Sequence, residues 1–450
     1  MHAQTSPTER NENISLVEKL GGRNPEAWVP ETTAIFIVHG IGNQKPLETI
    51  DEFSRTLVHT YKKYLGYDNI TVEHKLKPKS ADSGSREWYD NFLRIRMKGS
   101  EHYIDLYEYY WAHHTEGMAD WEDINQWLSG VTKGAEKFYK KNSKLSVTFE
   151  TNGPLVSKWK YKFFIGFVSR IFLFWRSILR GLSSLFSRVP LIGGLLSNNL
   201  NSVTESTGRT LSNIVGDMVA YTVTDAKNKY YPVRRAILDG AVNGIKDLME
   251  EGVLDDSGEP VKGGARTYPR IIVGGHSLGS VVSFDAINRI NLMVNSCLLK
   301  TYDGAGFCKV VCDENAKGKT VCDQMKGYFT FGSPLDKVAF FLRENIPDTQ
   351  YVRQQLLNHM MNFKQRNWSL SLQEEYGYFE IENKDAKRLL DDMKWTNYYD
   401  QHDYVSGDLD FYAPLTNVNC NFKGNIFSFT HSDYWDHEDF YKDIILTHLS

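Results

Sequence analysis

The stretch of residues 275–279 constrains the fold of this chain more than any other feature. Its sequence is Gly-His-Ser-Leu-Gly, and it separates an apolar run, residues 271–273, from residues 280–287, which can form a helix. Gly-x-Ser-x-Gly between a strand and a helix is typical of a sharp turn that exposes the serine hydroxyl at the end of the strand. Larger side chains would collide at the two glycine positions of such a turn. The pattern predicts a strand–turn–helix unit with Ser277 as a candidate nucleophile; the alternative is a glycine-rich turn around a buried structural serine.

A second glycine-containing turn lies near the N-terminus. Residues 34–38 form a continuous apolar run, as expected of a parallel strand that is buried on both faces, and His39 and Gly40 follow it directly. Glycine lets the backbone of such a turn approach a reacting carbonyl, so that an N–H group can bind the oxyanion. We expect one oxyanion donor from Leu278 and the other from Gly40 or Ile41.

A histidine near the C-terminus is the candidate base. His431 follows a strand-like run, whereas His437 and His448 lie in the acidic, helix-like stretch after it. In a strand–turn–helix architecture of this kind, the catalytic residues follow in the order serine, acid, histidine. The imidazole would take the serine proton and pass it to the leaving group. We therefore predict His431 as the base.

Several aspartates between the serine and the histidine are candidates for the acid. Asp403 comes after a strand-like stretch, where the last strand but one should deliver its carboxylate, and Asp336 follows an earlier strand-like run. Asp400 and Asp408 rank below both. The carboxylate would orient the ring of His431 and stabilise the imidazolium. The sequence favours Asp403 and leaves Asp336 as the second choice.

Together these elements resemble the α/β-hydrolase superfamily of serine esterases and lipases. The matching segments are residues 36–40, 275–279, 331–334 and 395–405, and His431 with Tyr434 and Trp435. The resemblance implies an α/β-hydrolase fold, with a twisted, mostly parallel sheet and helices on both faces. It also implies hydrolysis of carboxylic esters through an acyl-enzyme, without a metal or an organic cofactor. It does not supply the substrate, because one fold hosts many chemistries.

At 450 residues, the chain is longer than such a core requires. We expect an N-terminal arm at residues 1–32, a core at 33–115 and 230–450, and a large helical insertion, a cap or lid, at 116–229. The arm has no apolar stretch of the length that a cleavable signal peptide needs. Within the core, residues 103–111 alternate as a strand does, and residues 233–250 have the pattern of an amphipathic helix.

Charge and cysteine content bound the compartment and the partners. The net charge of −4 argues against general nucleic-acid binding. The five cysteines, an odd number in a large chain, favour reduced thiols and a cytoplasmic protein. Cys308, Cys312 and Cys322 lie close together, but their spacing matches no zinc site well. An ordinary insertion between strands is favoured there over a disulfide-tied hairpin.

The predicted insertion contains a basic segment. Residues 151–204 carry seven Lys and Arg and no Asp or Glu, and on a helical wheel most basic residues of 158–188 share one face. Its charge-free stretches are shorter than the roughly 20 residues needed to cross a bilayer. A basic amphipathic helix on an anionic membrane surface fits this pattern, with Arg170, Arg176 and Arg180 as contacts. A cap helix packed on the core fits equally well, and a lid would combine both.

The sequence therefore predicts a serine carboxylic-ester hydrolase, a lipase or phospholipase that acts on a lipid or other acyl ester at a membrane surface. A thioesterase or an amidase would use the same three residues. The alternative outside the enzymes is a catalytically silent hydrolase-like module that binds membranes or partner proteins.

Overall fold

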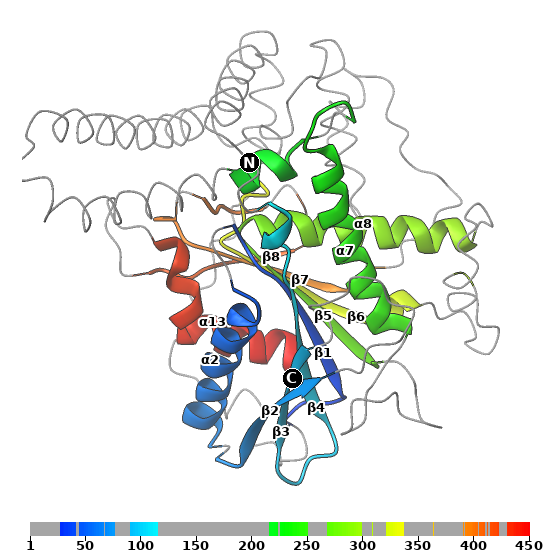
Figure 1. Ribbon diagram of the computed structural model, residues 1–450. Coiled ribbons are helices and arrows are strands. Elements are labelled where there is room, and N and C mark those ends of the chain that lie inside the picture. The colour runs from blue at the N-terminus through cyan, green and yellow to red at the C-terminus, as the bar shows by residue number, and fades with distance from the viewer. Residues whose placement is uncertain are drawn as a thin grey trace, which may run out of the picture.

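A computed structural model gives the architecture of the chain (Figure 1). It describes residues 28–41, 45–66, 68–76, 91–115, 216–223, 226–250, 268–298, 308, 321–336, 363, 390, 392–403, 405–409, 412, 415–422 and 430–450. Most of the expected N-terminal arm and residues 116–215 of the expected insertion lie outside these ranges, and so do Arg170, Arg176 and Arg180. The predictions on those segments stay predictions.

The described residues form one sheet of eight strands in the order β2-β3-β4-β1-β5-β6-β7-β8. The strands are β1 (Thr33–Val38), β2 (Ile70–Leu76), β3 (Asn91–Met97), β4 (Tyr103–Tyr109), β5 (Arg270–His276), β6 (Met325–Phe331), β7 (Lys394–Tyr399) and β8 (Thr416–Asn419). From β4 through β8 in this order, each strand is parallel to its neighbour, whereas β3 runs antiparallel to both β2 and β4. The expectation of an α/β protein with a mostly parallel sheet is confirmed.

Helices cover both faces of this sheet. The described helices are α2 (Glu48–Leu65), α7 (Tyr231–Glu250), α8 (Leu278–Leu298) and α13 (Glu438–Ile444), with 3-10 turns η2 (Ala112–His114), η4 (Val321–Gln324) and η6 (Thr430–Asp436) and a π-helical turn η7 (Ile445–Leu449). In Figure 1, α2 and α13 lie on one side of the strands and α7 and α8 on the other. Successive residues of a strand point to opposite faces. Accordingly Phe36 and Val38 of β1 join the core beneath α7 and α8, while Ile35 and Ile37 join the core beneath α2 and α13.

The antiparallel edge of the sheet is tied to the parallel part by a buried ion pair. Arg94 of β3 and Asp105 of β4 are opposite each other in register, and two nitrogens of the guanidinium lie 2.8 Å from the two carboxylate oxygens. Both side chains are fully buried, and the Tyr268 hydroxyl donates to Asp105 at 2.6 Å just before β5 begins. Buried charges need this degree of pairing, because their desolvation is costly.

The register brings the carboxyl ends of the central strands together. Val38, the last residue of β1, lies opposite Tyr109 of β4 and Gly275 of β5. The two predicted turns, after β1 and after β5, are therefore neighbours at one edge of the sheet. Gly279 makes this possible, because a Cβ at that position would lie 2.2 Å from the carbonyl oxygen of His39.

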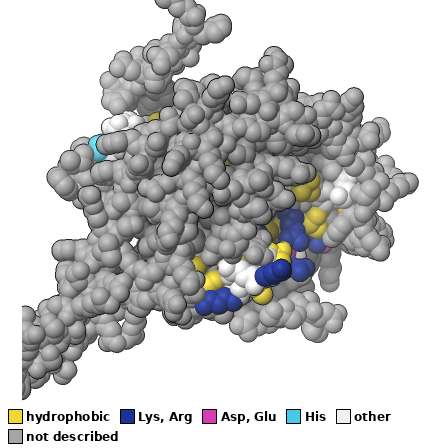
Figure 2. Space-filling view, turned by 90° about the horizontal axis from the view of Figure 1, so that it is seen from above, with side chains coloured by type: hydrophobic (Ala, Val, Ile, Leu, Met, Phe, Trp, Pro, Cys, Tyr) yellow, Lys and Arg dark blue, Asp and Glu magenta, His cyan; other side chains and the backbone are white. Residues whose placement is uncertain are grey.

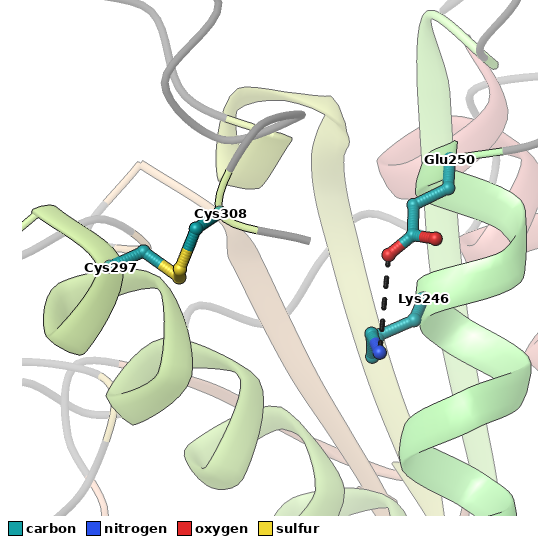
Figure 3. The surroundings of a disulfide bond; sticks show 4 residues. All are labelled: Lys246, Glu250, Cys297 and Cys308. Carbon is teal, nitrogen blue, oxygen red and sulfur yellow. Dashed lines mark ion pairs between the residues drawn. A yellow bond between two sulfur atoms is a disulfide. The ribbon is translucent and has the colours of Figure 1, made fainter. Parts of the chain in front are cut away.

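The structure corrects the expectation that the cysteines are reduced. Cys297, in the last turn of α8, forms a disulfide with Cys308 (Figure 3), and their Cα atoms are 5.1 Å apart. An odd number of cysteines excludes complete pairing but does not exclude one pair between neighbouring segments. Cys420 is a buried free thiol, Cys322 is also buried, and Cys312 lies outside the described residues. The cysteine count therefore gives no argument for a cytoplasmic location.

Among the described helices, none is both long enough and apolar enough to cross a membrane.

Figure 2 shows the molecule from above. On one part of this face, the Lys and Arg side chains of described residues lie next to hydrophobic side chains.

Candidate active site

Ser277 occupies the turn between β5, which ends at His276, and α8, which begins at Leu278. Its φ angle is 51°, in the left-handed region that non-glycine residues rarely adopt and that often marks functional sites. The turn is fixed by two backbone hydrogen bonds of 3.0 Å, from Ser277 N–H to the Phe331 carbonyl and from Ser280 N–H to the Ser277 carbonyl. The Ser277 hydroxyl is buried and has no hydrogen-bond partner within the described part of the chain. The sequence-predicted strand, turn and helix are all present.

The turn after β1 lies directly beside Ser277. A Cβ at Gly40 would lie 2.7 Å from the Ser277 Cβ, so a larger residue at position 40 could not be accommodated without displacing the serine. Leu278 is the first residue of α8, and the first N–H groups of a helix have no acceptor within the helix. Of the predicted oxyanion residues, Gly40 and Leu278 therefore adjoin Ser277, and Ile41 follows Gly40 in the same turn.

The peptide that joins Gly40 to Ile41 is held by the side chain of His39. The Trp111 N–H donates to His39 Nε2 at 2.9 Å, so the ring proton is on Nδ1, and Nδ1 donates to the Gly40 carbonyl at 2.6 Å. The His39 ring stacks on Trp111 with centroids 5.0 Å apart. Burial lowers the pKa of His39 to about 4, so the ring stays neutral and keeps this tautomer near neutral pH. These contacts fix the orientation of the Gly40–Ile41 peptide.

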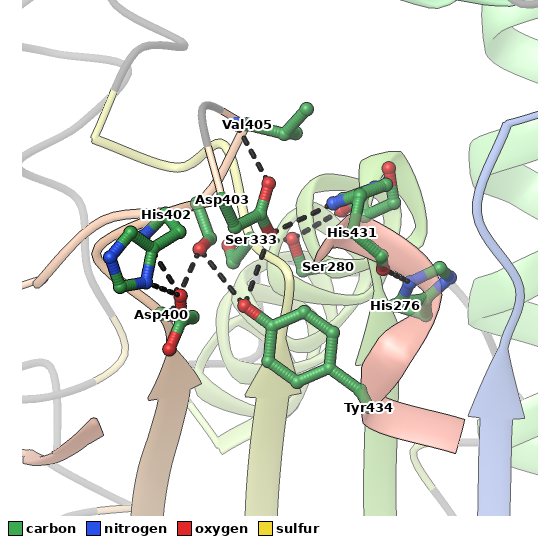
Figure 4. A network of polar contacts seen from close by, with 11 residues as sticks. His276, Ser280, Ser333, Asp400, His402, Asp403, Val405, His431 and Tyr434 are labelled. Carbon is green, nitrogen blue, oxygen red and sulfur yellow. Dashed lines mark hydrogen bonds and ion pairs between the residues drawn. The ribbon is translucent and has the colours of Figure 1, made fainter. Parts of the chain in front are cut away.

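His431 and Asp403 form the polar pair that the sequence predicts. His431 lies on η6, and its Nδ1 is 2.9 Å from Asp403 Oδ2, in the loop after β7 (Figure 4). The Val405 N–H donates to the other oxygen of Asp403 at 2.9 Å. Burial alone would raise the pKa of Asp403, but the His431 ring and the Val405 N–H hold it well below its ordinary value. A carboxylate that accepts from Nδ1 leaves the lone pair of the neutral imidazole on Nε2.

Several contacts bring the His431 ring to the edge of the sheet where Ser277 lies. A Cβ at Gly332 would lie 2.9 Å from His431 Cε1, and Gly332 directly follows Phe331, whose carbonyl accepts from the Ser277 N–H. The His276 ring, next to Ser277, lies 5.1 Å from the His431 ring between centroids. The serine and the histidine, far apart in the sequence, therefore share one site.

Asp336, the second choice for the acid, has a different environment. Its carboxylate packs against the backbone of Gly407, since a Cβ there would lie 2.3 Å from Asp336 Oδ2. Asp400 accepts from the His402 N–H at 2.8 Å and from the Phe422 N–H at 2.7 Å. The carboxylate that accepts from His431 Nδ1 is that of Asp403.

The sequence assigned no role to two side chains of this site, His276 and Tyr434. The Nε2 of His276 lies 3.4 Å from the His431 carbonyl, and burial lowers the pKa of His276 to about 3, so the ring is neutral. The Tyr434 hydroxyl donates to Asp403 Oδ2 at 3.0 Å. The signal for Tyr434 was its position three residues after His431. This spacing places the two side chains directly above one another if the segment is a 3-10 turn. The sequence instead suggested that His431 ends a strand.

Comparison of the chain with protein-family models, with curated proteins and with solved structures gives no match. Within the described residues, no group of three or more His, Cys, Asp or Glu side chains is arranged to hold a metal ion.

Proposed function

We propose that this protein is a serine carboxylic-ester hydrolase with an α/β-hydrolase fold, in which Ser277, His431 and Asp403 act together. The observation that carries the proposal is the state of Ser277. It sits in a left-handed turn at the end of β5, its buried hydroxyl has no hydrogen-bond partner in the described part of the chain, and the His431–Asp403 pair lies at the same edge of the sheet. A structural serine would rarely combine strained backbone, burial and an unsatisfied hydroxyl.

In the proposed reaction, Ser277 Oγ attacks the acyl carbonyl while His431 Nε2 takes its proton. Asp403 stabilises the resulting imidazolium through Nδ1, and the imidazolium then protonates the leaving alcohol. In the second half of the reaction, His431 Nε2 takes a proton from water as the water oxygen attacks the acyl carbon. The imidazolium then returns the proton to Ser277 Oγ, which releases the acid and restores the serine. His39 and His276 are neutral near pH 7, so neither adds a charge that would oppose protonation of His431.

The backbone around Ser277 supports Leu278 and Ile41 as the donors to the oxyanion. The N–H and C=O groups of a trans peptide point in opposite directions. The Gly40 carbonyl is held by His39, whose ring stacks on Trp111 beyond the end of β4. Since β1 lies between β4 and β5, we expect the Ile41 N–H to point toward the β5 side, where Ser277 lies. Of the two residues that the sequence left open, Ile41 is thus favoured over Gly40.

A fluorophosphonate probe tests the proposed nucleophile directly. It is expected to label the wild-type protein covalently at Ser277, because serine attack on phosphorus displaces fluoride when the hydroxyl is activated. Ser277→Ala should remove the label completely. The control is Ser54→Ala on α2, whose hydroxyl donates to the Asp51 carbonyl at 3.0 Å and which should label as the wild type does. Intact-protein mass spectrometry measures the result, and an unlabelled wild type would refute the enzyme and favour a silent binding module.

We further propose a lipid or other acyl ester presented at an anionic membrane surface as the substrate, with the cap insertion as the membrane contact. This part rests on the sequence, since the basic segment lies outside the described residues. Each basic residue near an anionic surface contributes about 1 kcal/mol, so charge reversal at Arg170, Arg176 and Arg180 should weaken binding to phosphatidylserine vesicles by at least ~100-fold. Binding of the wild type should also weaken as salt is added.

Vesicle sedimentation measures this effect, and a matched triple reversal controls for net charge. Arg55, Lys62 and Lys98 are exposed basic residues of the described core. Reversing them changes the total charge by the same amount but should leave most of the binding intact. Equal binding by the wild type and the Arg170, Arg176 and Arg180 variant would remove the membrane contact from the proposal.

A further inference from the structure

Tyr434 and His431 are carried by the same 3-10 turn, η6, three residues apart. A 3-10 helix has three residues per turn, so side chains at positions i and i+3 point the same way. Both side chains reach the same atom of Asp403: His431 Nδ1 lies 2.9 Å and the Tyr434 hydroxyl 3.0 Å from Oδ2 (Figure 4). One carboxylate oxygen therefore accepts from two donors that a single turn presents together.

The Tyr434 hydroxyl is held in place from two directions. The ring is completely buried and makes edge contacts with Phe422, Phe331 and Phe440. Burial raises the pKa of Tyr434 well above its ordinary value, so the hydroxyl stays protonated and remains a donor. Ser406 Oγ lies 3.0 Å from the Tyr434 hydroxyl. We expect a buried hydroxyl that is held in this way to keep its position throughout a catalytic cycle.

The loop after β7 supports the same arrangement. The Asp400 N–H lies 3.3 Å from Ser406 Oγ, so a chain of polar contacts runs from the end of β7 through Ser406 and Tyr434 to Asp403. Hydrogen bonds in such a chain polarise one another. The carboxylate of Asp403 is thus stabilised by hydrogen bonds from both the Tyr434 hydroxyl and the His431 ring.

We propose that Tyr434 is a positioning residue of this site, which orients Asp403 and limits how strongly Asp403 holds the proton on His431. The inference rests on the proposed function. A carboxylate oxygen that also accepts from a phenol is a weaker partner for the imidazolium. The same hydrogen bond fixes the plane of the carboxylate, and with it the direction in which the His431 ring points.

Other ionisable groups approach this pair from neighbouring strands. His276 approaches His431 from β5 and His39 lies behind it at the end of β1; burial keeps both neutral. Asp400 and Cys420 come from the β7–β8 edge, and burial raises the pKa of the Cys420 thiol above its ordinary range, so that it stays protonated. Asp403 itself accepts from the Val405 N–H, from Ser406 and from the Tyr434 hydroxyl. Of these donors, Tyr434 shares Oδ2 with His431.

Tyr434→Phe tests the inference through the pH profile of ester hydrolysis. We expect kcat on the plateau to fall about 10-fold, the size typical of losing an outer partner of a catalytic group, with KM unchanged. The acid limb of kcat/KM should move to higher pH, because Asp403 without the phenol holds the His431 proton more strongly. A role limited to packing would lower stability and leave the position of the acid limb unchanged.

Tyr398→Phe is the matched control. Tyr398 on β7 is also fully buried and donates to an aspartate, with its hydroxyl 2.9 Å from Asp443 Oδ2 on α13. This variant loses a partly buried tyrosine–aspartate hydrogen bond outside the site, so it should be destabilised as well but keep the acid limb of the wild type. If the acid limbs of both variants coincide with that of the wild type, the inference is wrong.

Site-specific incorporation of 3-fluorotyrosine at position 434 covers the case in which Tyr434→Phe does not fold. The fluorinated phenol is a stronger donor of nearly the same size, so the acid limb should move in the opposite direction, to lower pH. Fluorophosphonate labelling separates the two levels of the argument. A wild type that does not label refutes the proposed function, whereas labelled variants with an unmoved acid limb refute the role of Tyr434 alone.

Discussion

Asp403→Asn should lower kcat for ester hydrolysis by about 10⁴-fold, the loss seen when a catalytic aspartate is replaced by its amide. The carboxylate now accepts a hydrogen bond from His431 Nδ1 at 2.9 Å, which keeps the lone pair on Nε2. An amide that offers its NH₂ group to Nδ1 would place the ring proton on Nε2, where it blocks acceptance of the serine proton. The imidazolium would also lose its charged partner. KM should change little, because these losses are felt mainly in the transition state.

Steady-state hydrolysis of a soluble acyl ester measures this effect, with Asp336→Asn as the matched control. Both substitutions replace a carboxylate by an amide, but Asp336 packs against the backbone of Gly407 and the His431 hydrogen bond goes to Asp403. Asp336→Asn should therefore retain activity within about 10-fold of the wild type. A large loss in Asp336→Asn together with a small loss in Asp403→Asn would assign the acid to Asp336 instead.

The elements of this fold that follow from local pattern were predictable. The apolar run at residues 34–38 became β1, the alternating residues 103–111 gave β4, and the amphipathic pattern at 233–250 gave α7. The placement of Ser277 and His431 at one edge of the sheet was predictable for a different reason. A serine between two glycines after a strand has few structural uses, and chain order then restricts where the histidine can lie.

Features that depend on contacts between distant segments were not predictable from pattern. Nothing in the local sequence shows that Cys297 meets Cys308, because the pairing depends on where α8 ends in space. The sequence placed His431 at the end of a strand, whereas η6 brings Tyr434 onto the same carboxylate. The link from His39 to Trp111 joins two strands that are neighbours only after the sheet has formed. Periodicity identifies elements, and hydrogen bonds between elements decide the chemistry of a site.

Gly40→Ala should lower kcat/KM by about 100-fold, because it combines a displaced serine with a displaced oxyanion donor. A methyl group at position 40 would lie 2.7 Å from the Ser277 Cβ and 2.9 Å from His276 Nδ1. Neither neighbour can yield easily: Ser277 is held by backbone hydrogen bonds at both ends of its turn, and His276 is enclosed by Phe331 and Trp435. The turn after β1 must therefore retreat, which carries the Ile41 N–H away from the reacting carbonyl.

The rate of fluorophosphonate labelling, measured beside the thermal unfolding midpoint, separates this effect from a general loss of stability. Gly99→Ala is the control: Gly99 has a φ angle of 92° but no atom within 4 Å of the added Cβ. That variant bears backbone strain of about 1–2 kcal/mol without a clash at the site, so it should unfold earlier than the wild type yet label at the same rate. Gly40→Ala should label slowly even where it is fully folded. If folded Gly40→Ala labels at the wild-type rate, the turn after β1 supplies no donor to the oxyanion. The oxyanion would then have to be bound by Leu278 and by groups elsewhere in the chain.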